Sequence, residues 1–456
     1  MKDLAIQPKN HSTKKYLFLI TWPIFIEVFL QMLMKMTDVF MLSYVSDDAV
    51  AAIGVVNQLM TFMFVLFNFT AMGSGVIVSQ YIGANNPKGI RKTIANAITI
   101  NLIFGVAISL FVGLNRHFLL GLFSLGPNLY EYANTYTLIV GLALFAQAMI
   151  LTVSSILQAM GYTKDVMLAV LIMNVINIIG NYVLIFGVGP FPQMGVTGVA
   201  LSTAVIRIFV MFALFMVLRY RMDEPLALRE YFTYDKEYAS KILGIGVPSA
   251  GEQLSYNISQ IVLTMMITTL GATALATRVY STNLMSVLTV FSLSIAKGMQ
   301  IYIGQLVGAR KTDEAYNALF VGLKYATVIT IIIGGIFALF GKQIFGLFSS
   351  DPNLIMLGAL ILVIELLLQP ARTGNLVIIS ALRASGDAVF PVMVGITIMW
   401  GVLVPLAYVL GIVMEFGLVG FWVAMLVDEW IRASIMFFRW KNKRWLGKSI
   451  TANKIK

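Results

Sequence analysis

Three ionisable residues interrupt the first long apolar segment of the chain, which runs over residues 16–44. They are Glu27, Lys35 and Asp38. Glu27 and Asp38 are eleven residues apart, which is three helical turns plus about 20°. They therefore share a helix face, and Gln31 lies near that face. Burial favours the neutral form of a carboxyl group unless a cation opposes it, so Asp38 is predicted to bind a proton or a cation. The alternative is a static pair with Lys35, one turn away, that only neutralises charge.

The surroundings of Asp38 suggest a mobile segment with an adaptable surface. Pro23 removes a backbone hydrogen bond near the start of the same segment and permits a bend there. Methionine is frequent around Asp38, and Met34 is one of four such residues. Flexible thioethers suit a pocket for varied apolar ligands, although packed or lipid-facing methionines would have the same pattern.

A second polar stripe lies in the apolar segment 165–188. Asn174, Asn177 and Asn181 recur near every fourth position, so they line one face of a helix. In one interpretation the stripe faces Asp38 and shares a cation or a hydrogen-bond network with it. In the other it joins helices, a role for which asparagine is well suited in membranes.

The second half of the chain has its own buried ionisable candidates. Glu365 and Arg372 are seven residues apart and point the same way on a helix, so Arg372 is expected to neutralise Glu365 or Glu252. Arg432 is expected to pair with the acidic residues one turn before it. That pairing favours a structural role.

The elements that must position these residues follow from hydropathy. The 456-residue chain is 59% hydrophobic and 12% charged, with a mean hydropathy of +0.86, so lipid must surround most of it. Each segment is long enough to cross about 30 Å of hydrocarbon and lacks the alternation of barrel strands. We therefore predict an all-α polytopic membrane protein with helices at 16–44, 50–82, 93–115, 130–160, 165–188, 195–219, 241–269, 275–307, 318–340, 354–384, 388–411 and 417–440.

Basic residues predict the orientation. Nearly all connecting Lys and Arg residues fall on the side of the two termini, whereas Arg116 and Lys342 fall on the other. The positive-inside rule therefore places both termini in the cytoplasm, in a plasma (inner) membrane protein. Topology and anionic lipid headgroups account for the net charge of +11, so nucleic acid is not an expected partner.

An internal repeat divides the chain. Matching residues recur 225 positions apart. Examples are Pro23 and Pro248, Glu27 and Glu252, Gln80 and Gln305, Ala159 and Ala384. Six helices per copy is an even number, so the two copies are parallel repeats. We expect an amino-terminal lobe at 1–219, a cytoplasmic linker at 220–240, a carboxyl-terminal lobe at 241–440 and a cytoplasmic tail at 441–456. Leu263 stands where Asp38 would repeat, which suggests that coupling chemistry is concentrated in the amino-terminal lobe.

Several functional classes are disfavoured. The chain has no cysteine and only two histidines, so a metal centre of these ligands is not expected. None of the phosphate-loop, zinc-protease or serine-hydrolase motifs occurs, and the chain is not expected to be an enzyme. A channel normally needs a filter or a ring of like residues, and no such segment stands out. A cleft between two repeats that opens alternately to either side favours a transporter.

Several motifs together resemble the multidrug and toxic compound extrusion (MATE) family over essentially the whole chain. They are Thr37 to Met41 (TDVFM), Gln80 to Ala84 (QYIGA), Asn174 to Gly187 (NVINIIGNYVLIFG), Gly195 to Thr203 (GVTGVALST) and Ala381 to Asp387 (ALRASGD). The resemblance implies a twelve-helix exporter of drugs or toxic compounds that exchanges them for protons or sodium ions, without a further cofactor.

The resemblance also assigns site residues. Asp38 falls where the family has a first-helix carboxylate central to coupling, Asn177 matches a fifth-helix asparagine, and Thr203 matches a sixth-helix hydroxyl. Asn181 stands where several members have an aspartate. Asparagine in place of that aspartate removes one negative charge, which disfavours a tight sodium site. The chain also departs from the sodium-coupled NorM branch at two positions where that branch has carboxylates, because Tyr256 and Arg372 stand there.

These departures favour the proton-coupled, DinF-like branch, with sodium coupling as the alternative. The family commonly exports amphipathic cations, which are the expected substrates of a protein that we expect to act as a monomer. Lys35, Lys297 and Arg372 offset the buried carboxylates, so an anionic or zwitterionic solute, or a lipid-linked substrate, is the competing expectation.

Overall fold

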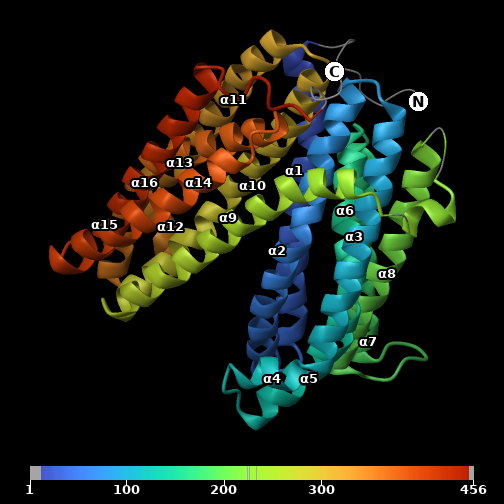
Figure 1. Cartoon of the computed structure of the whole chain (residues 1–456). Coiled ribbons are helices and arrows are strands. Elements are labelled where there is room, and N and C mark those ends of the chain that lie inside the picture. The colour runs from blue at the N-terminus through green and yellow to red at the C-terminus, as the bar shows by residue number, and fades with distance from the viewer. Residues whose placement is uncertain (1–11, 223, 225, 233, 451–456) are drawn as a thin grey trace. The chain divides into compact units, whose positions relative to one another are not determined.

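The structure, a computed structural model, describes residues 12–222, 224, 226–232 and 234–450, and all its regular elements there are helices. The outermost parts of the predicted cytoplasmic tails lie outside these residues. In the first repeat the helices are α1 (Thr13–Ser43), α2 (Asp47–Gly83), α3 (Pro87–Leu114), α4 (Arg116–Gly121), α5 (Pro127–Leu142), α6 (Leu144–Ala159), α7 (Thr163–Phe186) and α8 (Gly195–Arg221) (Figure 1).

A short 3₁₀ helix, η2 (Leu228–Phe232), precedes the second repeat. Its helices are α9 (Lys236–Thr268), α10 (Ala272–Gly308), α11 (Thr312–Leu339), α12 (Gly341–Gly346), α13 (Pro352–Ala384), α14 (Val389–Ile398), α15 (Val404–Tyr408) and α16 (Gly417–Lys441). Two π-helical segments, η3 (Met399–Leu403) and η4 (Val409–Val413), join α14 and α15 into one irregular span.

Every predicted apolar segment coincides with a helix or a continuous helical span. Within the described part of the chain, nine helices are long and apolar enough to cross a membrane. The pair α5 and α6, bent by 48°, forms a tenth such span. The two remaining long helices, α9 and α16, carry more polar residues. Hydropathy therefore located all twelve long elements, including the two that fail a strict test of apolarity.

The repeat is also present in the backbone. Gly161 and Gly386, which are 225 positions apart, both adopt positive φ angles, of 89° and 95°. Asn85 and Arg310 have the same spacing and φ angles of 50° and 60°. A positive φ strains most side chains and ends a helix sharply. The same turns therefore end equivalent helices in both repeats.

Two compact units make up the fold. The first comprises residues 22–82 and 86–250, and the second comprises 12–21, 83–85 and 251–450 of the described chain. Helix α1 thus gives its first turns to the second unit, and α9 gives its first half to the first unit. The two divisions fall close to Pro23 and Pro248. The lobe boundaries expected from the repeat stay a prediction.

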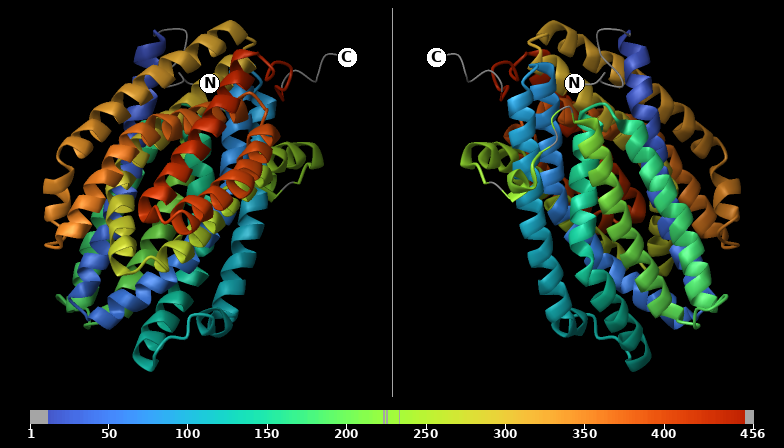
Figure 2. Two further views of the ribbon diagram at one scale, coloured as in Figure 1. Left: turned by 90° about the vertical axis from the view of Figure 1, so that its left-hand side faces the viewer. Right: turned by 90° about the vertical axis from the view of Figure 1, so that its right-hand side faces the viewer.

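Close backbone packing ties these exchanged segments to their units. In the second unit the Tyr16 hydroxyl donates to Gln305. In the first unit a Cβ on Gly246 would collide with the carbonyl of Phe69, so only glycine permits this approach of α9 to α2. Also in the first unit, α7 and α8 lie side by side (Figure 2).

Candidate functional site

A polar cluster in the first unit surrounds Asp38. The side-chain Nδ2 of Asn181 donates to Asp38 Oδ1 at 2.7 Å and lies 3.3 Å from Asn177 Oδ1. Both asparagines are buried and Asp38 is half-buried. Asn177 and Asn181 lie four residues apart, so α7 presents both amides on the face toward α1. The asparagine stripe therefore meets Asp38, while the third member, Asn174, bonds to its own helix at Val170.

Helix α8 supplies the other side of this cluster. Thr203 is 2% exposed, and its hydroxyl lies within hydrogen-bonding reach of Tyr136. Tyr136 of α5 lies near Thr203 and Asp38. Asn181 Oδ1 and Asn177 Nδ2 are buried without a partner. Buried polar atoms are nearly always paired, so such a concentration is unusual for a purely structural core.

Arg207, one turn beyond Thr203, is the residue that sequence reasoning missed. Its side chain is buried, with Nε and Nη1 unbonded and the guanidinium carbon 5.5 Å from the ring centroid of Phe64. It lies close enough to Asp38, Lys35 and Tyr136 to interact electrostatically with each. An arginine in the apolar stretch AVIRIFVMF was a detectable signal. We call Asp38, Asn177, Asn181, Thr203, Tyr136 and Arg207 the Asp38 cluster.

The other candidates on α1 form no ion pair with Asp38 in the described structure. Glu27 is buried and accepts hydrogen bonds from Gln158 and, at 3.4 Å, from Gln31. Lys35 is exposed, and no ion pair joins it to Asp38 in the described structure. Met34 is half-buried. The static pair considered from the sequence is therefore not formed.

In the second unit the candidate charges form a bonded network. Glu365 accepts hydrogen bonds from Trp422 Nε1 at 2.9 Å and from Gln369 at 2.8 Å. Arg372 lies 3.7 Å from Glu365 and 3.5 Å from Glu429. The predicted pairing of Arg372 with Glu365 is thus confirmed.

The network continues along α16. Arg432 lies 3.0 Å from Glu429 and also contacts Asp428, as predicted. Asn375 donates to Glu429 at 3.1 Å. Tyr256, half-buried on α9, lies within electrostatic range of Arg372 and Arg432. Carboxylates of this second network, named here the Glu365 network, are thereby held by cations and neutral donors.

The alternative pairing of Arg372 with Glu252 is wrong. Glu252 lies 2.6 Å from Arg383 instead. Arg383 follows Arg372 by eleven residues on α13, a separation of about 16 Å along the helix axis. Arg383 lies in the last turn of α13, within the helix predicted at 354–384.

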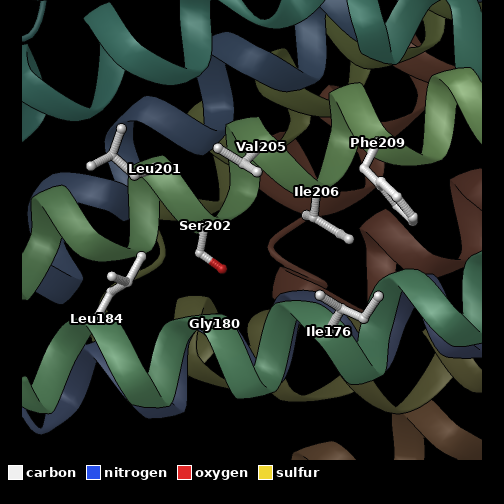
Figure 3. Close-up of a pocket in the computed structure, with 8 residues that line it drawn as sticks. All are labelled: Ile176, Gly180, Leu184, Leu201, Ser202, Val205, Ile206 and Phe209. Carbon is white, nitrogen blue, oxygen red and sulfur yellow. The ribbon is translucent and has the colours of Figure 1, made fainter. Parts of the chain in front are cut away.

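An apolar groove of about 360 Å³ lies between α7 and α8 (Figure 3). Its lining includes Ile176, Gly180 and Val205, with Ser202 as a polar member. Val205 is 64% exposed, so the groove opens to the surroundings of the protein. A membrane span with such a face is suited to contact with lipid.

Paired six-helix repeats, membrane-crossing helices and ionisable side chains buried within them define the class of membrane transporters with two parallel repeats. A profile of the MatE family matches residues 23–183 and again residues 248–409. The second match begins 225 positions after the first, which is the spacing of the internal repeat.

Known proteins resemble the whole chain. The uncharacterized transporter YisQ of Bacillus subtilis is 41% identical over 434 residues, which cover 95% of each chain. The probable multidrug resistance protein NorM of Thermotoga maritima is 25% identical over 96% of this chain and 94% of its own. The chain therefore belongs to the MATE family of transporters.

Solved structures share the fold. A MATE protein in complex with MaD3S superposes with a TM-score of 0.87 at 21% identity, over 97% of this chain and 98% of its own. A MOP superfamily transporter from Pyrococcus furiosus Vc1, for which a reverse polarity of the binding pocket is described, has a TM-score of 0.86, 20% identity and the same coverage.

Proposed function

We propose that this protein is a secondary exporter that moves drugs or other toxic organic compounds in exchange for protons bound at Asp38. The observation that carries the proposal is the bonding of this carboxyl group. Asp38 accepts a hydrogen bond from the neutral amide of Asn181, whereas Glu365 and Glu252 lie beside arginines. A carboxylate in an ion pair resists protonation. Asp38 forms no ion pair in the described structure, because Arg207 lies within electrostatic range but not in contact, so its carboxyl group is freer to exchange a proton.

The transport cycle follows from this assignment. In the outward-facing state Asp38 takes up a proton and becomes neutral. Its changed bonding rearranges Asn177 and Asn181, and the bend at Pro23 follows, which releases substrate outside. Return to the inward-facing state delivers the proton to the cytoplasm, and alternating access between two lobes completes the cycle. Glu27 and Glu252 assist or bind substrate.

Sodium is the second candidate for the coupling ion. Oxygen atoms suit hard cations, and Asn181 Oδ1 lies unbonded near Asp38, with the Thr203 hydroxyl in the same cluster. Two features favour the proton instead. Asn181 supplies no second negative charge, and Arg207 adds a positive charge within electrostatic range of Asp38. We therefore propose proton coupling in a plasma-membrane monomer with cytoplasmic termini.

Purified protein in liposomes tests the coupling ion. Ethidium transport is followed by fluorescence while a pH gradient or a sodium gradient is imposed separately, with protein-free liposomes as the control. Transport driven by the pH gradient alone is the expected result. Transport that requires sodium would reassign the ion to the Asn181 and Thr203 oxygens. Absence of transport with either gradient would contradict ethidium export and direct the search to other substrates.

A further inference from the structure

The charge of the Asp38 cluster and its immediate neighbour is unusual for a site that binds only cations. Asp38 supplies one negative charge, whereas Arg207 and the nearby Lys35 supply two positive charges. Tyr136, Asn177 and Asn181, the remaining groups facing Asp38 from α5 and α7, are neutral. With Asp38 ionised, the net charge is positive. A purely cationic ligand would therefore meet repulsion from two side chains.

Arg207 is prepared to receive an anionic group. It is 8% exposed, and its Nε and Nη1 atoms have no hydrogen-bond partner. Buried guanidinium groups normally pair with a carboxylate or bond to carbonyl groups, because their desolvation is costly. The planar fork of N–H donors matches a carboxylate or phosphate oxygen pair. Lys35 is exposed on α1 and lies within electrostatic range of Arg207.

Linkage between proton and ligand narrows the ligand class further. This step rests on the proposed exchange of substrate for a proton at Asp38. A purely anionic ligand would be bound more tightly when Asp38 is protonated, and by reciprocity it would promote protonation. Proton and ligand would then travel together rather than exchange. A ligand with a cationic nitrogen at Asp38 competes with the proton, and an acidic group on the same ligand satisfies Arg207.

We propose that the Asp38 cluster binds zwitterionic amphipathic compounds, with a cationic amine at Asp38 and a carboxylate or phosphate group at Arg207 and Lys35. The apolar remainder of such a compound would contact the methionine-rich face of α1. Arg207 is thereby a substrate-binding residue that determines specificity for the acidic group.

Three fluorescent probes that share a dansyl group on the same five-carbon diamine chain but differ in charge test this proposal. Nε-dansyl-lysine is a zwitterion, dansylcadaverine is its decarboxylated cation, and Nα-acetyl-Nε-dansyl-lysine is its anion. Equilibrium dialysis against purified protein in detergent, with empty micelles as the blank, measures each affinity at pH 7.5. The zwitterion is expected to bind about tenfold more tightly than either other probe, since charge-assisted hydrogen bonds carry this discrimination.

Variants identify the residues responsible. Arg207→Gln is expected to abolish the preference for the zwitterion over dansylcadaverine, Arg207→Lys to retain part of it, and the exposed Lys35→Gln to reduce it. Arg221→Gln is the matched control, because Arg221 is on the same helix but pairs with Asp165 at 2.7 Å. It is expected to keep the preference.

The outcomes separate this inference from the proposed function. A wild-type protein that binds dansylcadaverine as tightly as the zwitterion overturns the inference. An unchanged preference in both Arg207→Gln and Lys35→Gln also overturns it, and Lys35→Gln is decisive if the buried variant fails to fold. If the binding of dansylcadaverine weakens at lower pH neither in wild type nor in any variant, the amine does not compete with a proton, and the proposed proton exchange at Asp38 fails. The charge preference measured at pH 7.5 is interpreted independently of that result.

Discussion

The arginines at the two candidate sites differ in their partners. In the second unit Arg372, Arg383 and Arg432 each lie within 3.7 Å of a carboxylate. In the first unit Arg207 is buried without such a contact, and the nearby Asp38 bonds to an amide. The same six-helix repeat thus holds arginines in ion pairs with carboxylates in one copy and a buried arginine without a carboxylate contact in the other.

This difference teaches which charges are structural. A buried ion pair contributes little net stability, but removal of one partner leaves an uncompensated charge and is strongly destabilising. An unpaired buried cation already lacks that compensation, so the fold loses little without it. Buried charge that is kept at a cost and left unbonded is a mark of binding rather than of architecture.

The largest expected effect concerns the Glu365 network. Arg372→Met should lower the free energy of unfolding by about 3–5 kcal/mol, because Glu365 and Glu429 lose their shared cation. Denaturant titration followed by tryptophan fluorescence measures the change. Arg207→Met removes the same charge from the first unit and should leave stability unchanged or raised. Equal losses in the two variants would erase the distinction between the units.

The next effect concerns transport. Asp38→Asn should reduce transport driven by a pH gradient on the order of 100-fold, because a neutral amide cannot exchange the coupling proton. Flux of ethidium into or out of liposomes with an imposed gradient measures this. The paired counterpart Glu365→Gln should keep the response to pH and change stability instead. Normal pH-driven transport by Asp38→Asn would refute the coupling role.

A smaller effect is expected at Trp422, whose indole N–H bonds to buried Glu365. Trp422→Phe should cost about 2 kcal/mol of stability, since a buried acceptor oxygen of Glu365 loses its hydrogen-bond donor. Trp430→Phe serves as the control, because Trp430 is half exposed and bonds a backbone carbonyl at 3.2 Å. Thermal or denaturant unfolding midpoints of the two variants measure these losses. Equal losses of stability in Trp422→Phe and Trp430→Phe would show that the hydrogen bond to Glu365 makes no particular contribution.

The smallest effect is expected at the linker of the first unit. A hydrogen bond from the backbone N–H of Ala227 lowers the pKa of Glu230, and Lys92 lowers that of Asp235. Because both pKa values are lowered in the folded protein, these contacts contribute fully to stability above about pH 4. Their contribution to stability is lost as acid protonates the two carboxylates.

Hydrogen exchange of linker peptides, corrected for the intrinsic pH dependence, checks this prediction. Protection should fall below about pH 4 in wild type. Arg91→Gln removes the cation 2.9 Å from Glu230 and should lower protection already at neutral pH. Protection that is the same at pH 3 and pH 7 would show that these ion pairs do not hold the linker.

Sequence predicted the elements more completely than the contacts between them. Apolar length fixes where helices form, and the repeat fixes their grouping, so the twelve long elements were all found. Which side chains contact each other across two helices depends on how those helices pack, and the periodicity of one helix does not predict that packing. Gln158 beside Glu27 and Arg383 beside Glu252 were therefore missed. The π-helical turns of η3 and η4 were also hidden, because their apolar residues look like any other span.

The exchange of helix segments between the units has a consequence for the order of synthesis. Residues 12–21 leave the ribosome early, yet they belong to a unit whose other members, apart from 83–85, follow residue 250. The first unit likewise closes only after the opening half of α9 has been made. The second unit therefore cannot be finished until both repeats have been made, and a chain severed between the repeats would yield two pieces that each lack segments of their unit.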